Sequence, residues 1–278
     1  MEAPLRSNGS NTRPAIQTPS RGSGRSRVAG RVYRVLDTAL SGEKSAVMNV
    51  TAAELLSEPV AVAGVIKAAV DRPGVGLMGH WMVHELLRRS AVYGDLIDAL
   101  ASPNPSTRAA AARVCGAARI SESALWIGDM LQDPDPTVRD SAVRALAQMG
   151  GRRAVDLLMA AADRIPVYRL AIALSRAASD VDIEALMRQP ASEDAAVATV
   201  LACGLRRDVL RVAPLLGIAH DRRWPRKVRL AACKALATIG DRSAADGLHR
   251  LAMTDTDTAV KTAADRAYRR LLKRAVGR

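Results

Sequence analysis

Residues 133–150, with the sequence DPDPTVRDSAVRALAQMG, decide the fold because they are the clearest copy of a unit that recurs along the chain. The two Asp-Pro pairs predict a turn, and Pro136 fixes a backbone angle that suits the first turn of a helix. Apolar residues then recur every three or four positions from Val138 to Met149, as expected for one buried helix face. Gly150 can end the helix in a left-handed conformation. The stretch therefore predicts a turn followed by an amphipathic helix.

A shorter apolar helix predicted at 124–131 precedes this turn, so the unit is a helix, a turn and a second helix. Copies of the second helix can be aligned on a basic residue near its start, and these residues are Arg108, Arg139, Arg169, Arg229 and Lys261. The steps between them are 31, 30, 60 and 32 residues, and a degenerate copy at 192–197 divides the longest step. One such pair cannot bury its apolar faces alone, and a repeat of this length is typical of a helical solenoid.

The sequences at 133–150 and 226–240 resemble HEAT and HEAT-like repeats, which are also known from the phycobilin lyases. The resemblance covers residues 95–275 and implies an all-α fold, a right-handed α-solenoid of helical hairpins. It also implies that the aligned arginines, such as Arg139 and Arg229, pair with acidic residues in the turns of adjacent units. The repeat does not specify a function, because scaffolds, enzyme subunits and nucleic-acid binders all use it.

The composition agrees with stacked helices. Hydrophobic residues make up 49% of the 278 residues and Phe is absent, so the core must consist mainly of Ala, Leu and Val. The three cysteines, Cys115, Cys203 and Cys233, lack the spacing of a metal or redox site and are predicted to be buried free thiols. No apolar run is long enough for a membrane span or typical of a signal peptide, which predicts a soluble, cytoplasmic protein.

Three regions are predicted along the chain. Residues 1–26 are polar and basic, with too few apolar residues to order them, and are expected to form a disordered arm. Residues 27–94 are expected to form a helical cap and degenerate repeats, including an amphipathic helix from Val28 to Leu40. Residues 95–278 are expected to form about six repeats that end in a basic helix. Whether the arm is a targeting segment stays open.

The positive charge is concentrated at the two ends of the chain. Of the net charge of +13, residues 1–34 and 261–278 each carry +6, which leaves +1 for the body. The last helix holds a basic patch that consists of Arg269, Arg270, Lys273 and Arg274. These ends are expected to contact acidic surfaces, and nucleic acid is a possible partner for them.

One cluster has the residue types of a metal site. His80 and His84 are spaced to share a helical face, and Glu85 follows, but no third ligand is evident. Deoxyhypusine hydroxylases, which also have HEAT-like repeats, bind iron through several His-Glu pairs, whereas this chain has only His84-Glu85. The three residues are weak metal candidates. No nucleophile motif is present, so we predict no catalytic residues, no cofactor and no enzymatic activity.

A second basic residue follows the aligned position by five residues in four of the units. The predicted binding residues at this position are Arg113, Arg144, Leu174, Lys234 and Arg266, with Ala202 in the fourth unit. Because the second helices line the concave face in this architecture, the face is expected to be basic at both ends and apolar in the middle. This pattern predicts a scaffold or adaptor for a protein partner with acidic flanks and an apolar centre. A nucleic-acid binder that uses the basic termini, and a lyase-type or chaperone-type accessory subunit of an enzyme, are the alternatives.

Overall fold

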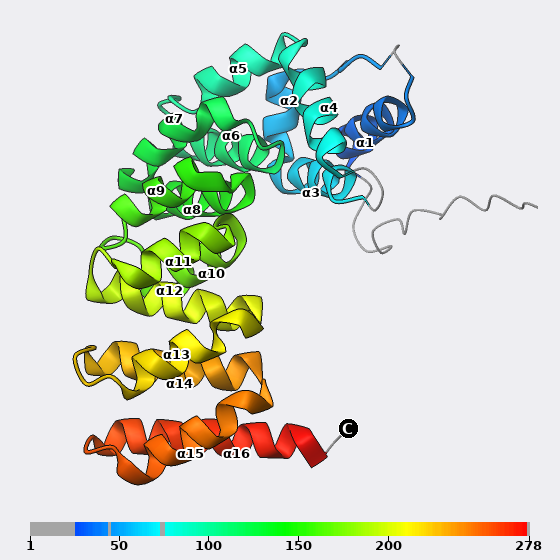
Figure 1. Ribbon diagram of the computed structural model, residues 1–278. Coiled ribbons are helices and arrows are strands. Elements are labelled where there is room, and N and C mark those ends of the chain that lie inside the picture. The colour runs from blue at the N-terminus through cyan, green and yellow to red at the C-terminus, as the bar shows by residue number, and fades with distance from the viewer. Residues whose placement is uncertain (1–25, 44–45, 73–75, 277–278) are drawn as a thin grey trace, which may run out of the picture.

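The chain forms an arc of stacked helices, as the computed structural model shows for residues 26–43, 46–72 and 76–276 (Figure 1). No strand is present among these residues, and the all-α solenoid predicted from the repeats is confirmed. The arm predicted at 1–26 lies outside the described residues except for Ser26, which caps the first helix through its side chain.

Six successive helical hairpins form most of the arc, and in each the two helices are joined by a short turn. The hairpins are α5 (Val92–Ala99) with α6 (Pro105–Ala117), α7 (Ala124–Asp129) with α8 (Pro136–Met149), α9 (Gly151–Ala160) with α10 (Val167–Ala177), α11 (Asp180–Arg188) with α12 (Glu193–Arg206), α13 (Val212–His220) with α14 (Arg226–Ile239), and α15 (Ala245–Thr254) with α16 (Thr258–Val276). Short 3₁₀ turns flank some of the first helices, at η1 (Ser121–Ser123), η2 (Met130–Gln132), η3 (Val209–Arg211) and η4 (Arg242–Ala244). The degenerate copy expected near 192–197 is the start of α12.

Local chemistry sets where the second helices begin and end. In α8, Pro136 occupies the first helical turn, and the Asp135 side chain accepts hydrogen bonds from the backbone of Thr137 and Val138. Gly150 then ends the helix at a φ of 66°, a value that suits glycine. Asn104 caps α6 in the same way. The turn and helix predicted at 133–150 are therefore confirmed.

The helices lie in two layers. The second helices α6, α8, α10, α12, α14 and α16 pack directly against one another, and we call them the inner layer; the first helices form the outer layer. In the inner layer Gly116 faces the backbone of Ala145 so closely that an added Cβ would lie 2.5 Å from its Cα. In the outer layer, Gly128 faces the Leu157 side chain instead. The arc bends toward the layer with the closer helices, and α6, α8 and α10 lie on that side in Figure 1.

The first four helices extend the stack at its N-terminal end. They are α1 (Arg27–Leu40), α2 (Ala52–Ser57), α3 (Pro59–Val70) and α4 (Gly76–Arg88). The amphipathic helix predicted from Val28 to Leu40 is confirmed as α1, which buries Val32 and Leu36. α3 packs against α6 and α1 packs against α3, so the inner layer continues to this end. An extended segment, residues 46–50, connects to α2 beside α1.

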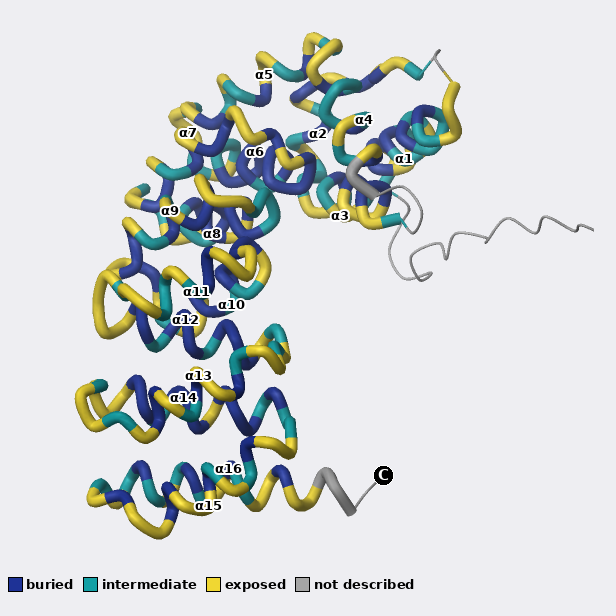
Figure 2. Tube along the Cα trace, in the orientation of Figure 1, coloured by how far each residue is buried: buried dark blue, intermediate teal, exposed yellow. Residues whose placement is uncertain are grey.

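The core is continuous along the arc, and most helices show one buried and one exposed side (Figure 2). The three thiols are buried in the inner layer, at Cys115 on α6, Cys203 on α12 and Cys233 on α14, as predicted. Burial raises the pKa of Cys115 to about 12, and of Cys203 and Cys233 to about 11. These thiols are packed as small apolar side chains.

Candidate functional site on the inner layer

Each inner helix exposes one row of side chains, and the predicted basic residues occupy equivalent places in that row. Arg144 on α8 and Lys234 on α14 each precede an alanine, Ala145 or Ala235, that packs against a glycine of the neighbouring inner helix. Arg144, Lys234 and Arg266 are exposed, and Arg113 is half-buried. The helix stacking thus brings these four predicted residues to corresponding positions along one face.

Leu174 does not belong to this row, and the prediction for it was wrong. Its side chain is fully buried in α10, and it corresponds to Leu146 of α8, which is also fully buried. Ala202 in α12 is buried as well. The sequence alignment of the repeats started from the basic residue near the turn. The correspondence between inner helices is instead set by their buried residues, which place Leu174 opposite Leu146. Counting back from Leu174 by the offset between Leu146 and Arg144 gives Ile172 as the residue equivalent to Arg144.

The middle of the row is nevertheless apolar. Tyr168 is 53% exposed and Ile172 is half-buried on α10, while Leu201 is half-buried and Leu205 is exposed on α12. None of these four residues was expected from the sequence. The spacing of apolar residues within each helix could have identified them. It gives the buried face of the helix, and the exposed row then follows as the residues on the opposite side.

Contacts between helices show that the row forms one surface. Arg113 Nε donates a hydrogen bond to Ser141 Oγ of α8 at 3.2 Å. Asp140 of α8 pairs with Arg144 at 2.9 Å and also with Arg169 of α10. The Lys234 Nζ atom of α14 lies 5.4 Å from the centre of the Tyr168 ring on α10, so it reaches across α12. We call this face the inner surface, made up of Arg113, Arg144, Tyr168, Ile172, Leu201, Leu205, Lys234 and Arg266.

The aligned arginines near the turns have a structural role. Arg108 binds Asp133 of the next turn through two hydrogen bonds, of 2.8 and 2.9 Å. Arg229 pairs with Asp255 of the next turn, and both side chains are almost fully buried. These two pairs agree with the resemblance. Arg139 differs from that expectation, because it donates to the carbonyl oxygens of Asp133 and Pro134 in its own turn, at 2.8 and 2.9 Å.

The acidic partners of these arginines stay ionised. The hydrogen bonds from Arg108 hold the pKa of Asp133 below its ordinary value. Burial of Asp255 acts to raise the pKa of that carboxyl group, but hydrogen bonds from Arg229 and from the Asp257 backbone outweigh it, and the net shift is downward. Arg229 also donates to the Ala219 carbonyl oxygen at 2.9 Å, so it connects the end of α13 to the turn before α16.

Residues 95–177 match the sequence model of HEAT repeats. This part of the chain consists of HEAT repeats. None of the curated proteins matches the chain in sequence. Among solved structures, it is similar to human deoxyhypusine hydroxylase in complex with glycerol, at 17% identity and a TM-score of 0.35, over 88% of this chain and 97% of that one. An engineered protein is similar at 21% identity and a TM-score of 0.30, over 88% and 96% of the two chains. At these scores neither similarity carries an argument about function.

The histidines before the HEAT match do not converge on a third ligand. His84 Nε2 lies 3.2 Å from Glu122 Oε2, whereas Glu85 binds Arg88 and Arg89, and these hydrogen bonds lower the pKa of Glu85 to about 2. His80 has a buried Nδ1 without a hydrogen-bond partner, and burial lowers its pKa. Within the described chain, no three His, Cys, Asp or Glu side chains are grouped so that they could hold a metal ion.

The basic patch at the end of the HEAT stack is exposed on α16. Arg269 pairs with Asp265 of the same helix at 2.9 Å, while Arg270 and Lys273 have no acidic partner in the described chain. The Arg274 side chain lies outside the described residues. No described helix combines the length and the apolar character that crossing a bilayer requires.

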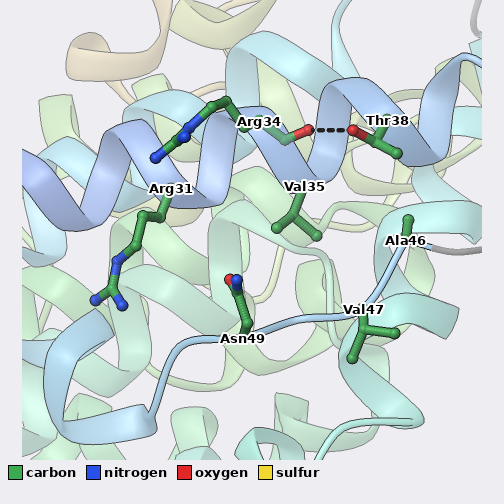
Figure 3. Close-up of a pocket in the computed structure, with 7 residues that line it drawn as sticks. All are labelled: Arg31, Arg34, Val35, Thr38, Ala46, Val47 and Asn49. Carbon is green, nitrogen blue, oxygen red and sulfur yellow. Dashed lines mark hydrogen bonds between the residues drawn. The ribbon is translucent and has the colours of Figure 1, made fainter.

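A pocket of about 270 Å³ lies at the opposite end, between α1 and residues 46–50 (Figure 3). Its lining residues are Arg31, Arg34, Val35, Thr38, Ala46, Val47 and Asn49. Sequence reasoning did not find it, because residues 43–50 lie between two predicted helices. The residue types at 47–50 (Val, Met, Asn and Val) do not alternate between apolar and polar, so the alternation of exposed and buried side chains was not readable from the sequence.

Proposed function

We propose that this HEAT-repeat chain is a non-catalytic scaffold that holds a protein partner on its inner surface. The observation that carries the proposal is the order of side chains along that surface. Arg113 and Arg144 lie at one end, Lys234 and Arg266 lie at the other, and apolar side chains lie between them. HEAT repeats commonly mediate protein interactions, which agrees with this use of the inner layer.

The apolar middle supplies the favourable free energy of binding. Tyr168 and Leu205 are exposed to water, and burying them against a partner releases that water. Tyrosine is well suited to such contacts, because its ring is large and its hydroxyl group can still form a hydrogen bond. The basic ends orient a partner with acidic flanks and increase its rate of association.

The distance from Arg144 to Arg266 sets the minimum length of a segment that contacts both basic ends of the surface. Four helix-to-helix steps separate Arg144 from Arg266, and at the usual spacing of packed helices they span about 30–40 Å. An extended chain covers this distance with about ten residues. The expected ligand is therefore a segment of at least this length with apolar residues at its centre and acidic residues at both ends.

Affinity capture from native cell extract tests the proposal. The chain carrying both Arg144→Glu and Lys234→Glu is compared with the unchanged chain and with a control carrying Arg152→Glu and Arg188→Glu. The control makes the same change of charge on the exposed faces of α9 and α11, in the outer layer. We expect a defined protein that the unchanged chain and the control both retain after nuclease treatment, and that the inner-surface variant loses.

Equal capture by both variants would contradict the use of the inner surface. Circular dichroism and thermal unfolding of each variant are needed alongside, because lost capture counts only if the stack remains folded.

A second candidate function is nucleic-acid binding through the basic C-terminal patch. It is favoured by the exposure of Arg270 and Lys273, which have no acidic partner in the described chain. Binding of this kind should weaken steeply as salt is raised, because phosphate contacts release counterions. Recovery of nucleic acid alone, lost at high salt and reduced by Arg270→Glu with Lys273→Glu, would support this function over the first.

A further inference from the structure

The non-helical segment at residues 46–50 has side chains that alternate between exposed and buried positions from Val47 to Val50. Met48 and Val50 are buried, whereas Val47 is 69% exposed and Asn49 is also exposed. This alternation is the two-residue period of a β-strand. One face of the segment is thus anchored in the core, and the other faces solvent.

From Val47 to Val50, no N–H or carbonyl group takes part in a hydrogen bond to any other part of the described chain. In the neighbouring helices α1 and α2 these groups are bonded within the helix or at its caps. An extended surface segment with free backbone groups is a template for pairing with another strand.

The wall opposite the segment is basic. Figure 3 shows Arg31 and Arg34 on α1, with Val35 pointing toward Asn49 of the segment. Arg31 is held by Glu54, whereas the exposed Arg34 side chain donates a hydrogen bond to the Gly30 carbonyl oxygen of its own helix, at 3.4 Å, and has no acidic partner in the described chain. None of the residues that line this pocket is acidic, whereas Glu54 and Glu58 line the adjoining hollow beside Arg31 and Arg34. The site therefore combines a backbone segment that has no hydrogen-bond partner in the described chain with the positive charge of Arg34, which has no acidic partner there.

We propose that an extended acidic segment of a partner protein adds as a strand along residues 47–50. Its backbone pairs with the free N–H and carbonyl groups, an acidic side chain binds Arg34, and an apolar side chain contacts Val35 and Val47. Strand addition of this kind takes its affinity from main-chain hydrogen bonds and its specificity from the side-chain contacts. The charge selects an acidic occupant, because a basic segment would be repelled by Arg34. This site is separate from the inner surface and does not depend on the function proposed for it.

A blocked synthetic peptide of about eight residues, with alternating glutamate and valine, serves as the probe, since natural strands have this length. A second peptide with lysine in place of glutamate is the matched control. Amide hydrogen exchange of the full chain, measured by NMR with and without peptide, gives the readout. We expect slower exchange at alternate amides between Val47 and Val50 with the glutamate peptide and no change with the lysine peptide.

Two variants separate this site from the inner surface. Arg34→Glu should weaken binding of the glutamate peptide by about tenfold, since a charge attraction becomes a repulsion. Arg144→Glu, which makes the same change on the inner surface, should leave it unaltered. The proposal is overturned by unchanged exchange at residues 47–50, by equal binding of the two peptides, or by Arg34→Glu and Arg144→Glu having the same effect.

Discussion

The inner and outer layers of the stack differ in the residues that separate neighbouring helices. Between α6 and α8, Gly116 lies against the backbone of Ala145, and Gly204 of α12 lies against Ala235 of α14 in the same manner. In the outer layer the corresponding contacts are between a glycine and a leucine side chain, at Gly128 and Leu157 and at Gly247 and Leu216. Small residues shorten one side of the stack and leucines lengthen the other. The curvature of the arc is therefore a consequence of residue size.

The difference also explains why the inner surface is available for binding. Inner helices bury most of their side chains against their neighbours, so each presents only a narrow row to solvent. The arginines near the turns do not belong to that row. Arg229, for example, is buried because it binds the turn of an adjacent unit. Residues of the row, such as Arg144, remain exposed even where they form an ion pair within their own helix.

The largest expected effect separates these two classes of arginine. Arg229→Met removes one partner of a buried ion pair and leaves Asp255 without compensation, which should cost about 3–5 kcal/mol. The matched change Arg144→Met breaks an exposed pair and should cost less than about 1 kcal/mol. Chemical denaturation of both variants measures the two losses. Similar losses would mean that Arg229 does not tie adjacent units together.

The dependence of stability on pH should also differ between Arg229→Met and the unchanged chain. Because the pKa of Asp255 is lowered in the folded chain, its contribution is complete above the ordinary carboxyl pKa of 3.8 and is lost as the pH falls through the lower, folded value. In Arg229→Met, burial without its partner raises the pKa of this carboxyl group, so its protonation should begin at a higher pH. The variant should therefore lose less stability than the unchanged chain as the pH is lowered through 3.8.

A smaller effect on stability should distinguish a glycine of the inner layer from a glycine of the outer layer. Gly116→Ala places a Cβ 2.5 Å from the Ala145 Cα, and since a backbone cannot rotate away, the helices must separate, at a cost of about 2 kcal/mol. Gly128→Ala places a Cβ 2.7 Å from Leu157 Cδ2, which can move, and alanine favours the helix; we expect a change within about 1 kcal/mol. Thermal unfolding of both variants gives the comparison. Equal losses would remove residue size as the explanation for the curvature.

The smallest effect concerns the thiols, all of which lie in the inner layer. With pKa values raised to about 12 for Cys115 and about 11 for Cys203 and Cys233, none should react with a thiol reagent at neutral pH until the stack opens. In Gly116→Ala, the neighbouring Cys115 should become the first to react. Mass spectrometry after timed alkylation identifies the modified residue. Faster reaction of Cys203 or Cys233 in that variant would contradict a local opening between α6 and α8.

Local sequence signals identified the repeat, and such signals are sufficient to place the starts of several helices. Pro136 with Asp135, and Asn104 before α6, act through residues within three positions, so the sequence contains all that is needed to place them. The capping box of Thr51 and Glu54 that opens α2 is another case. These features are decided by the backbone close to them, and neighbouring helices do not alter them.

Tertiary structure decided which side chains form the inner surface and which backbone is left unpaired. Leu174 and Ile172 are both apolar and two positions apart, and only the packing of α10 between α8 and α12 buries the first fully and leaves the second half-buried. Likewise, the contact between Lys234 and Tyr168 depends on the curvature that brings α14 toward α10 across α12. The sequence by itself determined a stack of repeated helix pairs with buried thiols. The residues exposed on the inner surface were decided by the neighbours of each helix, because the burial of a side chain depends on the contacts between helices.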